Sequence, residues 1–295
     1  MAARTLPKSA SRPPSVAILG LGNWGSSLAR ALTASGTPPV EIVRRRSGRM
    51  PAGIPTAAPV HTWTHAALQA DILWLCVPDA QIAPAAARIA RQLASRPHAT
   101  LPCVFHASGA LDSSELEPLR ALGCAVAAVH PLMTFPPSAK RSASPSLAGV
   151  PFAIEGDRRA QRAAFQLVRR LGGDPFLLDA TQKALYHAFG ALASPMLVSL
   201  LHATAQAGIA TGASKTQAMR RMRPIVERTV ANFFAQGAAA SFSGPIARGD
   251  HGTIRRHLQA LGGDPELLRV YRALANYAAQ HLPARNRPAL VRLLR

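Results

Sequence analysis

The chain has 295 residues, 48% hydrophobic and 16% charged, and its 34 lysines and arginines against 14 acids give a formal net charge of +20. A chain this apolar buries enough surface to offset the entropy of ordering, which excludes an intrinsically disordered protein and suits one large or two medium domains. The excess charge is almost all arginine, so it fits nucleic acid, an anionic ligand or a compositional bias.

The three cysteines and the N-terminus indicate the compartment. Cys76, Cys103 and Cys124 have neither CxxC nor CxxH spacing, and each lies in an apolar run. We interpret them as buried small side chains in a reducing cytoplasm. Residues 1–14 are basic, but no apolar segment of a secretory signal follows them, so we predict a flexible basic arm.

The first part of the chain alternates short apolar runs with helical patterns, which is typical of a doubly wound, mostly parallel sheet. We predict strands at 15–20, 40–43, 71–77, 101–107, 123–130 and 175–179, with an edge strand near Val60 and a further strand in VPFAIEG. The helices between them are predicted at 24–36, after Pro84, from Asp112 and at 157–172.

From about Thr181 onward the pattern is helical throughout, so we place the domain boundary between 180 and 181, with a sheet domain over 15–180 and an all-helical domain over 181–295. The stretch between Lys183 and Lys215 carries no formal charge, yet histidines and a proline interrupt it. We therefore predict a helix buried at the centre of the helical domain, and no membrane partner.

A glycine-rich turn, Gly20-Leu21-Gly22-Asn23-Trp24-Gly25, stands between the first predicted strand and the first predicted helix. Glycines suit this place because the backbone has to approach a pyrophosphate closely, while the helix N-terminus supplies free N–H groups. We predict that Gly20, Gly22, Asn23, Trp24 and Gly25 bind a dinucleotide, because strand, turn, helix and second strand occur in the expected order. The alternative is a glycine turn without a ligand.

The residues after the second predicted strand indicate which dinucleotide. An acid commonly binds the ribose hydroxyls there, but this chain has Arg44-Arg45-Arg46-Ser47, and Glu41 comes too early. Arginines and a serine suit a 2′-phosphate. We predict NADP(H) in preference to NAD(H), held by Arg44, Arg45, Arg46 and Ser47; the alternative is a solvated basic loop.

Val77-Pro78-Asp79 ends the apolar strand predicted at 71–77. Because ligands of open α/β sheets lie outside the carboxyl ends of strands, we predict that this turn flanks the nicotinamide side of the cofactor. Asp79 alternatively serves only as the N-cap of the next helix.

Six motifs together resemble a known family: GLGNWG, the VPD turn, HASGAL (106–111), HPLMTF (130–135), KALYH (183–187) and SGPIARGD (243–250). From about residue 15 to its end, the chain resembles two-domain Rossmann proteins whose C-terminal part is a domain of unknown function (number 2520). It is more distantly similar to pyrroline-5-carboxylate reductases, β-hydroxyacid dehydrogenases and ketopantoate reductases. Where the family usually has Ser-Asn, this chain has Ser194-Pro195.

The resemblance implies an NADP-linked oxidoreductase, often dimeric, in which a lysine exchanges a proton with the substrate oxygen. Lys183 and His187 lie at i and i+4, so both project from one face of a helix. An ammonium polarises a carbonyl and protonates the alkoxide that hydride arrival forms. We predict Lys183 and His187 as catalytic; the alternative is a surface lysine and a packed histidine.

Further substrate contacts are expected at strand ends and in the helical domain. His106 and His130 each follow a strand, and Ser108-Gly109 resembles the Ser-Gly turn that holds substrate in the dehydrogenases. For each histidine, a core side chain satisfied by backbone is the alternative.

In SGPIARGD, Arg248 is suited to a substrate carboxylate, and Asp250 is a second predicted substrate contact. Asp250 also has the position of an N-cap, since a helical pattern begins near His251.

Together these observations predict a cytoplasmic, NADP-dependent reductase of a small oxo acid such as ketopantoate. The 15–180 domain binds NADP, the 181–295 domain serves substrate binding and homodimerisation, and hydride transfer occurs in the cleft between them. An imine reductase of the pyrroline-5-carboxylate type and a non-catalytic NADP(H) sensor are the alternatives. We predict no nucleic-acid partner, because aromatic residues are only 5% of the chain and the arginines are dispersed.

Overall fold

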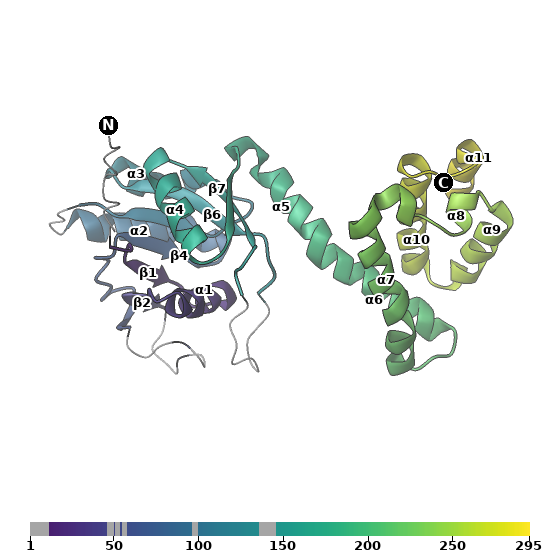
Figure 1. Ribbon diagram of the computed structural model, residues 1–295, viewed down its shortest axis with the longest axis horizontal. Coiled ribbons are helices and arrows are strands. Elements are labelled where there is room, and N and C mark those ends of the chain that lie inside the picture. The colour runs from purple at the N-terminus through teal and green to yellow at the C-terminus, as the bar shows by residue number, and fades with distance from the viewer. Residues whose placement is uncertain (1–11, 46–49, 51–53, 55–57, 96–99, 136–145) are drawn as a thin grey trace, which may run out of the picture. The chain divides into compact units, whose positions relative to one another are not determined.

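The computed structural model describes residues 12–45, 50, 54, 58–95, 100–135 and 146–295. The chain divides into two compact units, residues 1–191 and 192–295. Many of the helices and strands of both units are labelled in Figure 1.

The first unit is built on an eight-stranded sheet with the order β3-β2-β1-β4-β5-β6-β7-β8. Every neighbouring pair is parallel except β6 and β7, which are antiparallel. The predicted doubly wound, mostly parallel sheet is confirmed, including the edge strand near Val60. The strands are β1 (Val16–Leu19), β2 (Glu41–Arg44), β3 (Val60–Thr62), β4 (Ile72–Leu75), β5 (Cys103–His106), β6 (Ala125–Pro131), β7 (Pro151–Gly156) and β8 (Asp174–Leu177).

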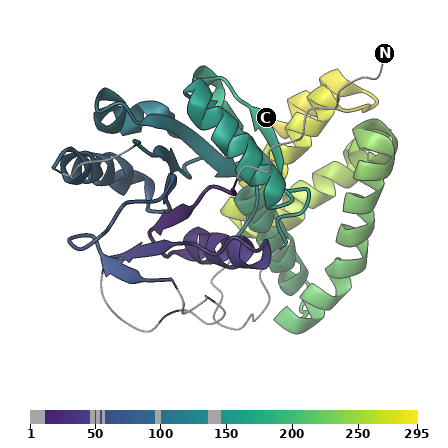
Figure 2. The same ribbon diagram turned by 60° about the vertical axis from the view of Figure 1, so that its left-hand side comes forward.

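Helices cover both faces of this sheet, as Figures 1 and 2 show. Apolar residues of α1 (Asn23–Ala34) and α4 (Arg158–Arg170) share one core with side chains of the strands, among them the fully buried Trp74 and Phe105. On the other face, α2 (Ile82–Ala94) and α3 (Glu117–Ala121) pack with the alternate strand residues. The central strands β1, β4 and β5 are buried on both faces, which is why they appear as continuous apolar runs in the sequence, whereas the edge strands β3 and β8 are partly exposed.

The cysteines are free: Cys103 and Cys124 are buried, and Cys76 is partly buried against the first core. The sheet unit ends with a 3₁₀ turn (Ala180–Gln182) and α5 (Lys183–Ala191). Lys183 therefore belongs to the sheet unit, beyond the expected boundary at 180.

The second unit is all helical. A small core of Ile254, Ala275, Ala279, Leu290 and Leu294 lies among its last helices. Asp250 caps α9 by accepting the Thr253 N–H at 3.0 Å, as predicted. The unit contains a π-helical turn (Leu192–Met196), α6 (Leu197–Ala210), α7 (Lys215–Ser241), α8 (Pro245–Arg248), α9 (His251–Ala260), α10 (Pro265–His281) and α11 (Arg287–Leu294).

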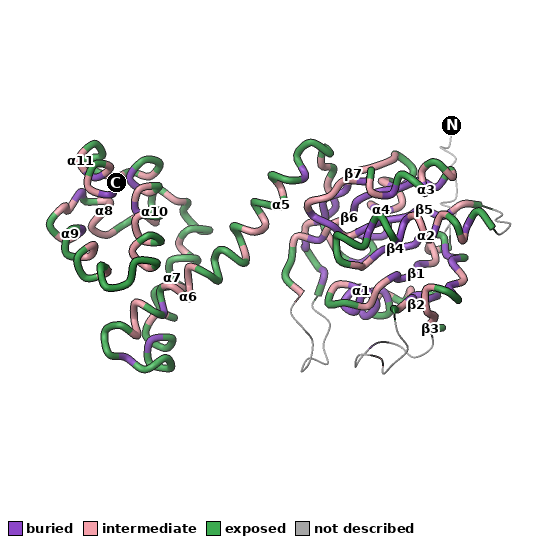
Figure 3. Tube along the Cα trace, turned by 180° about the vertical axis from the view of Figure 1, so that it is seen from behind, coloured by how far each residue is buried: buried purple, intermediate pink, exposed green. Residues whose placement is uncertain are grey.

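The prediction that the uncharged stretch is buried at the centre of the helical domain is wrong. Ala180–Ala210 is long and apolar enough to cross a membrane by length and composition, and none of its most apolar window is buried. Most of α5, α6 and α7 is exposed in Figure 3. Several large apolar side chains of this stretch are exposed, among them Leu185, Leu192 and Val198.

Candidate functional site

The glycine turn after β1 has the geometry of a phosphate-binding loop. Gly20 has a φ of 109°, and a Cβ placed on it would overlap the carbonyl of Cys76. A Cβ on Gly25 would overlap the Gly20 carbonyl, so α1 packs against the turn only because residue 25 is glycine. Gly22 caps α1 with extended backbone and has open space around it, where an anion would meet the helix N-terminus.

Trp24 lies in the first turn of α1, and its side chain packs into an aromatic cluster. Its ring centroid is 4.8 Å from that of Phe135, 5.7 Å from that of Trp74 and 6.0 Å from that of Phe152. The indole nitrogen is buried and has no hydrogen-bond partner among the described residues. Any contact of Trp24 with a cofactor is therefore expected from its backbone or ring edge.

The end of β2 carries the arginines predicted to select the cofactor. Arg44 is the last residue of β2 and is partly buried, and Arg45 directly after it is exposed. Arg46 and Ser47 lie outside the described residues. Glu41 points elsewhere, as expected: it is buried and accepts hydrogen bonds from His61 Nδ1 and from the Ala67 and Leu68 N–H groups.

The turn after β4 meets the turn after β5 through a hydrogen bond between side chains. Ser108 Oγ donates to Asp79 Oδ2 at 2.9 Å, and the same oxygen accepts the N–H groups of Ala110 and Leu111. Asp79 begins a 3₁₀ turn (Asp79–Gln81) and makes no capping hydrogen bond. The N-cap alternative for Asp79 is therefore wrong, and Asp79 instead fixes the Ser108 turn.

His106, the last residue of β5, uses both ring nitrogens inside the protein. Its Nδ1 accepts the Ser108 N–H at 3.2 Å, so Nε2 carries the proton and donates to the Asp112 carbonyl at 2.9 Å. Burial lowers the pKa of His106 to about 4, so the ring is neutral. This geometry favours the alternative of a core histidine satisfied by backbone.

Lys183 is one of the largest fully buried side chains in the structure, with a relative exposure of 2%. Its Nζ donates a hydrogen bond of 2.9 Å to the carbonyl of Ser108, 75 residues away in sequence. Burial lowers its pKa to about 8, opposed by the fields of Glu155, Asp112 and Asp79. Among the described residues it forms no ion pair, which is unusual for a buried ammonium. The surface-lysine alternative is therefore wrong.

His130, Gly109 and His187 lie together beside Lys183. A Cβ on Gly109 would come within 2.8 Å of His187 and 2.9 Å of His130, and the two imidazole centroids are 6.2 Å apart. His130 Nδ1 donates to the Ala107 carbonyl at 3.0 Å, and burial lowers the pKa of His130. The neutral ring thus has an unprotonated Nε2 next to Gly109.

Sequence reasoning missed two groups around Lys183. The Tyr186 hydroxyl is buried without a partner among the described residues, and its ring lies edge-on to His130 at 5.8 Å. Tyr186 is three residues after Lys183, so the helical periodicity of this segment could have placed it on the same face as Lys183. Glu155 of β7 is the carboxylate with the largest effect on Lys183, and it also accepts the Ser113 N–H and hydroxyl. No local pattern links Glu155 to Lys183, because a strand reversal brings it there.

Arg248 and Asp250 lie in the second unit, on either side of Gly249 with its φ of 69°. Arg248 is exposed, whereas the carboxylate of Asp250 binds Thr253 through both its backbone N–H and its hydroxyl. Their roles toward a substrate stay predictions.

The comparisons with known proteins agree with the motifs. Residues 7–131 match the Rossmann-like domain, and residues 150–278 match the domain of unknown function DUF2520. The predicted resemblance to a two-domain Rossmann family with this C-terminal domain is confirmed. No curated protein matches the chain.

Several solved structures share the fold over most of both chains. An NADP oxidoreductase candidate from Bacteroides fragilis is 18% identical, with a TM-score of 0.70, over 89% of this chain and 96% of that chain. Plasmodium falciparum pyrroline carboxylate reductase, solved with NADP bound, is 12% identical, with a TM-score of 0.58, over 94% and 98%. The reductive aminase from Aspergillus terreus, solved with NADPH and ethyl-5-oxohexanoate, is 16% identical, with a TM-score of 0.58, over 96% and 100%.

The buried ammonium makes stability depend on pH in a defined direction. The pKa of Lys183 is about 8 in the folded protein, below its ordinary value of 10.5, so between these values the unfolded chain binds more protons. The free energy of unfolding of the wild type should therefore rise, relative to Lys183→Met, as the pH increases from 8 to 10.5, by at most about 1.4 kcal/mol per pH unit. Urea unfolding of both proteins across this range measures it. If the difference in free energy of unfolding between wild type and Lys183→Met did not change with pH, the lowered pKa of Lys183 would be contradicted.

Proposed function

We propose that this chain is an NADP-dependent oxidoreductase that reduces a small oxo acid, with ketopantoate as the first substrate to test. The observation that carries the proposal is the buried Lys183 ammonium at the carboxyl edge of the sheet, beside Ser108, Gly109, His130 and His187. Because β1, β4 and β5 are parallel neighbours, the glycine turn after β1 lies at this same edge. Solved structures that share the fold support an oxidoreductase that uses NADP(H) or NAD(H), since the Plasmodium falciparum reductase has NADP bound and an imine reductase from Myxococcus stipitatus is in complex with NAD+.

The cradle at the start of α1 fits a dinucleotide pyrophosphate, since Gly22 is open while Gly20 and Gly25 exclude any side chain. Bound NADPH supplies the hydride. The Lys183 ammonium, with one N–H held by the Ser108 carbonyl, keeps two further N–H groups to donate to a substrate carbonyl oxygen. It then gives this oxygen a proton as the alkoxide forms. The neutral His130 accepts or relays a proton through Nε2, and His187 donates a hydrogen bond.

A second function, reduction of an imine, is favoured by the relatives. Pyrroline carboxylate reductases and imine reductases are among the solved structures that share the fold. An imine has to carry a proton on nitrogen before hydride arrives, and the resulting cation would face Lys183 unless the lysine is itself neutral. The ammonium therefore favours an oxo substrate. An activity assay with oxo acids and cyclic imines distinguishes the two substrate classes.

We also propose that the protein is cytoplasmic and forms a homodimer through its C-terminal helices. The free cysteines fit a reducing compartment. Phe234 of α7 is 82% exposed, and exposed apolar side chains continue along α5, α6 and α7. Exposed apolar side chains in such number mark an interaction surface, and a second copy of the chain is its proposed occupant.

For the cofactor, we expect wild-type protein to bind NADPH more tightly than NADH. Arg44→Ala and Arg45→Ala should each weaken NADPH binding about tenfold and leave NADH binding unchanged, because each removes a charge-assisted contact to the 2′-phosphate. Titration of tryptophan fluorescence measures both constants, with Arg91→Ala, an exposed arginine of α2, as the control. Equal affinity of the wild type for NADH and NADPH would overturn the NADP assignment.

For catalysis, we expect NADPH oxidation with at least one member of a panel of oxo acids and cyclic imines. Lys183→Met should lower kcat about 10²- to 10⁴-fold while NADPH affinity is kept, and wild-type kcat/KM for reduction should fall above pH 8 as the ammonium is lost. Lys215→Met, an exposed lysine of α7, is the matched control. Full turnover by Lys183→Met would refute the proton-donor role. Inactivity of the wild type toward the whole panel would favour the NADP(H) sensor.

For assembly, we expect wild-type protein to be a dimer in size-exclusion chromatography with light scattering. Phe234→Glu should shift it to a monomer, since a carboxylate would be buried at the interface. Ser95→Glu, at an exposed position of the sheet unit, should stay dimeric. A monomeric wild type at micromolar concentration would refute the dimer.

A further inference from the structure

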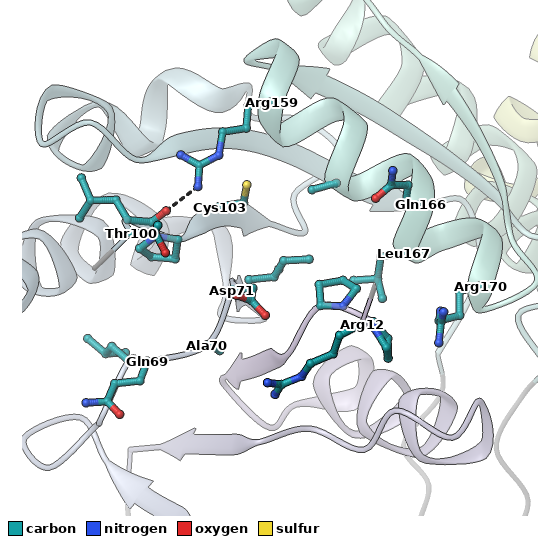
Figure 4. A pocket seen from close by; sticks show the side chains of 17 residues that line it. Arg12, Gln69, Ala70, Asp71, Thr100, Cys103, Arg159, Gln166, Leu167 and Arg170 are labelled. Atoms are coloured by element: carbon teal, nitrogen blue, oxygen red, sulfur yellow. Dashed lines mark hydrogen bonds between the residues drawn. The ribbon is translucent and has the colours of Figure 1, made fainter. Parts of the chain in front are cut away.

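A cavity lies at the edge of the sheet opposite the glycine turn. It has a volume of about 580 Å³ and lies between α4 and the residues that precede β1, β4 and β5. This volume is within the range of small-molecule sites. Figure 4 shows the side chains that surround it. Nothing in the proposed reaction uses this edge, because the carboxyl ends of β1 and β5 carry the glycine turn and Ser108.

One wall of the cavity is a stripe along α4. Arg159, Ala163, Gln166 and Arg170 follow one another at intervals of four, three and four residues, which places them on a single helix face. The small Ala163 between the two arginines leaves room between their long side chains. Arg159 lies in the first turn of α4, where the helix dipole disfavours a cation; the carboxylate at this helix end is that of the N-cap residue Asp157, which pairs with Arg120.

The charges around the cavity are predominantly positive. Arg12, before β1, adds a third guanidinium to those of Arg159 and Arg170, against the single carboxylate of Asp71. Among the described residues, none of the three arginines forms an ion pair. Asp71 accepts the N–H and the hydroxyl of Ser15 at 2.8 and 2.7 Å, and these bonds lower its pKa, so it stays ionised. The Arg12 guanidinium also lowers the pKa of Asp71, so these two cavity charges partly offset each other and leave the charges of Arg159 and Arg170 in excess.

Arg159 is held in place by the protein itself. One of its terminal nitrogens donates to the Leu101 carbonyl at 2.6 Å, a bond drawn in Figure 4. A guanidinium has five N–H donors, so this anchor leaves most of them for a ligand while reducing the entropy lost on binding.

We propose that this cavity is a second binding site, which takes a small organic phosphate. A guanidinium matches phosphate oxygens through bidentate hydrogen bonds, three of them line this cavity, and the amide of Gln166 adds a neutral donor at the same wall. The site is separate from the cofactor loop, since it lies at the amino ends of strands whose carboxyl ends carry that loop. The proposal therefore does not depend on the proposed reaction.

The test uses inorganic pyrophosphate as the probe in isothermal titration calorimetry at fixed ionic strength, with NADPH present to occupy the glycine turn, which would otherwise bind pyrophosphate as well. The double variant Arg159→Gln/Arg170→Gln removes two cavity guanidiniums, and Arg158→Gln/Arg169→Gln makes the same change of charge and spacing on α4 outside the cavity lining. We expect wild type and control to bind with similar affinity, and the cavity variant to bind at least tenfold more weakly. Citrate should bind more weakly than pyrophosphate.

Three outcomes overturn the proposal: no pyrophosphate binding by the wild type, an equal loss in both double variants, or equal binding of citrate. Ala163→Glu tests the site without removing an arginine, because it places a carboxylate at the centre of the stripe. It should abolish the cavity-dependent binding, and unchanged binding in Ala163→Glu would also refute the site. Thermal unfolding of each variant checks that it is folded at the titration temperature.

Discussion

The hydrogen bond from Lys183 to the Ser108 carbonyl is the contact on which the candidate site depends. It joins the first helix after the sheet to the turn after β5, and Ser108 extends it to β4 through Asp79 and to β5 through His106. A buried ammonium without an ion pair has a large desolvation cost, so this arrangement persists only if the surrounding fold holds the lysine there. The same cost lowers its pKa toward neutrality, where an amine exchanges protons readily.

Much of the fold was predictable because the sheet is buried on both faces. Strands such as Ile72–Leu75 read as uninterrupted apolar runs, and the glycine turn marks the first strand–helix junction. Gly20 and Gly25 lie so close to neighbouring backbone that no side chain fits at either position. The motif can therefore be recognised from a single sequence. The capping role of Asp250 followed from its position before a helical pattern.

Other features depend on contacts that local sequence does not encode. Lys183 is buried against the turn after β5 and near Glu155 of β7, and both precede it in the chain. The i, i+4 spacing of Lys183 and His187 could not reveal these contacts, so a surface lysine remained an alternative. Asp79 had the position of an N-cap, but the nearby Ser108 hydroxyl competes for its carboxylate. We predicted that α5 and α6 are buried because their residues are mostly apolar. Apolar composition indicates that a helix surface is covered, but it does not say whether the same chain or a partner covers it.

The single antiparallel pair has a consequence for the whole sheet unit. Because β7 runs against β6, Gly156 at its end lies beside Ala127 near the start of β6, and α4 begins at that edge. A fully parallel sheet would have started this helix at the opposite edge, together with the other helices that follow strands. One change of strand direction therefore separates the arginines at the start of α4 from the glycine turn, so substitutions can accumulate at either edge with little effect on the chemistry of the other.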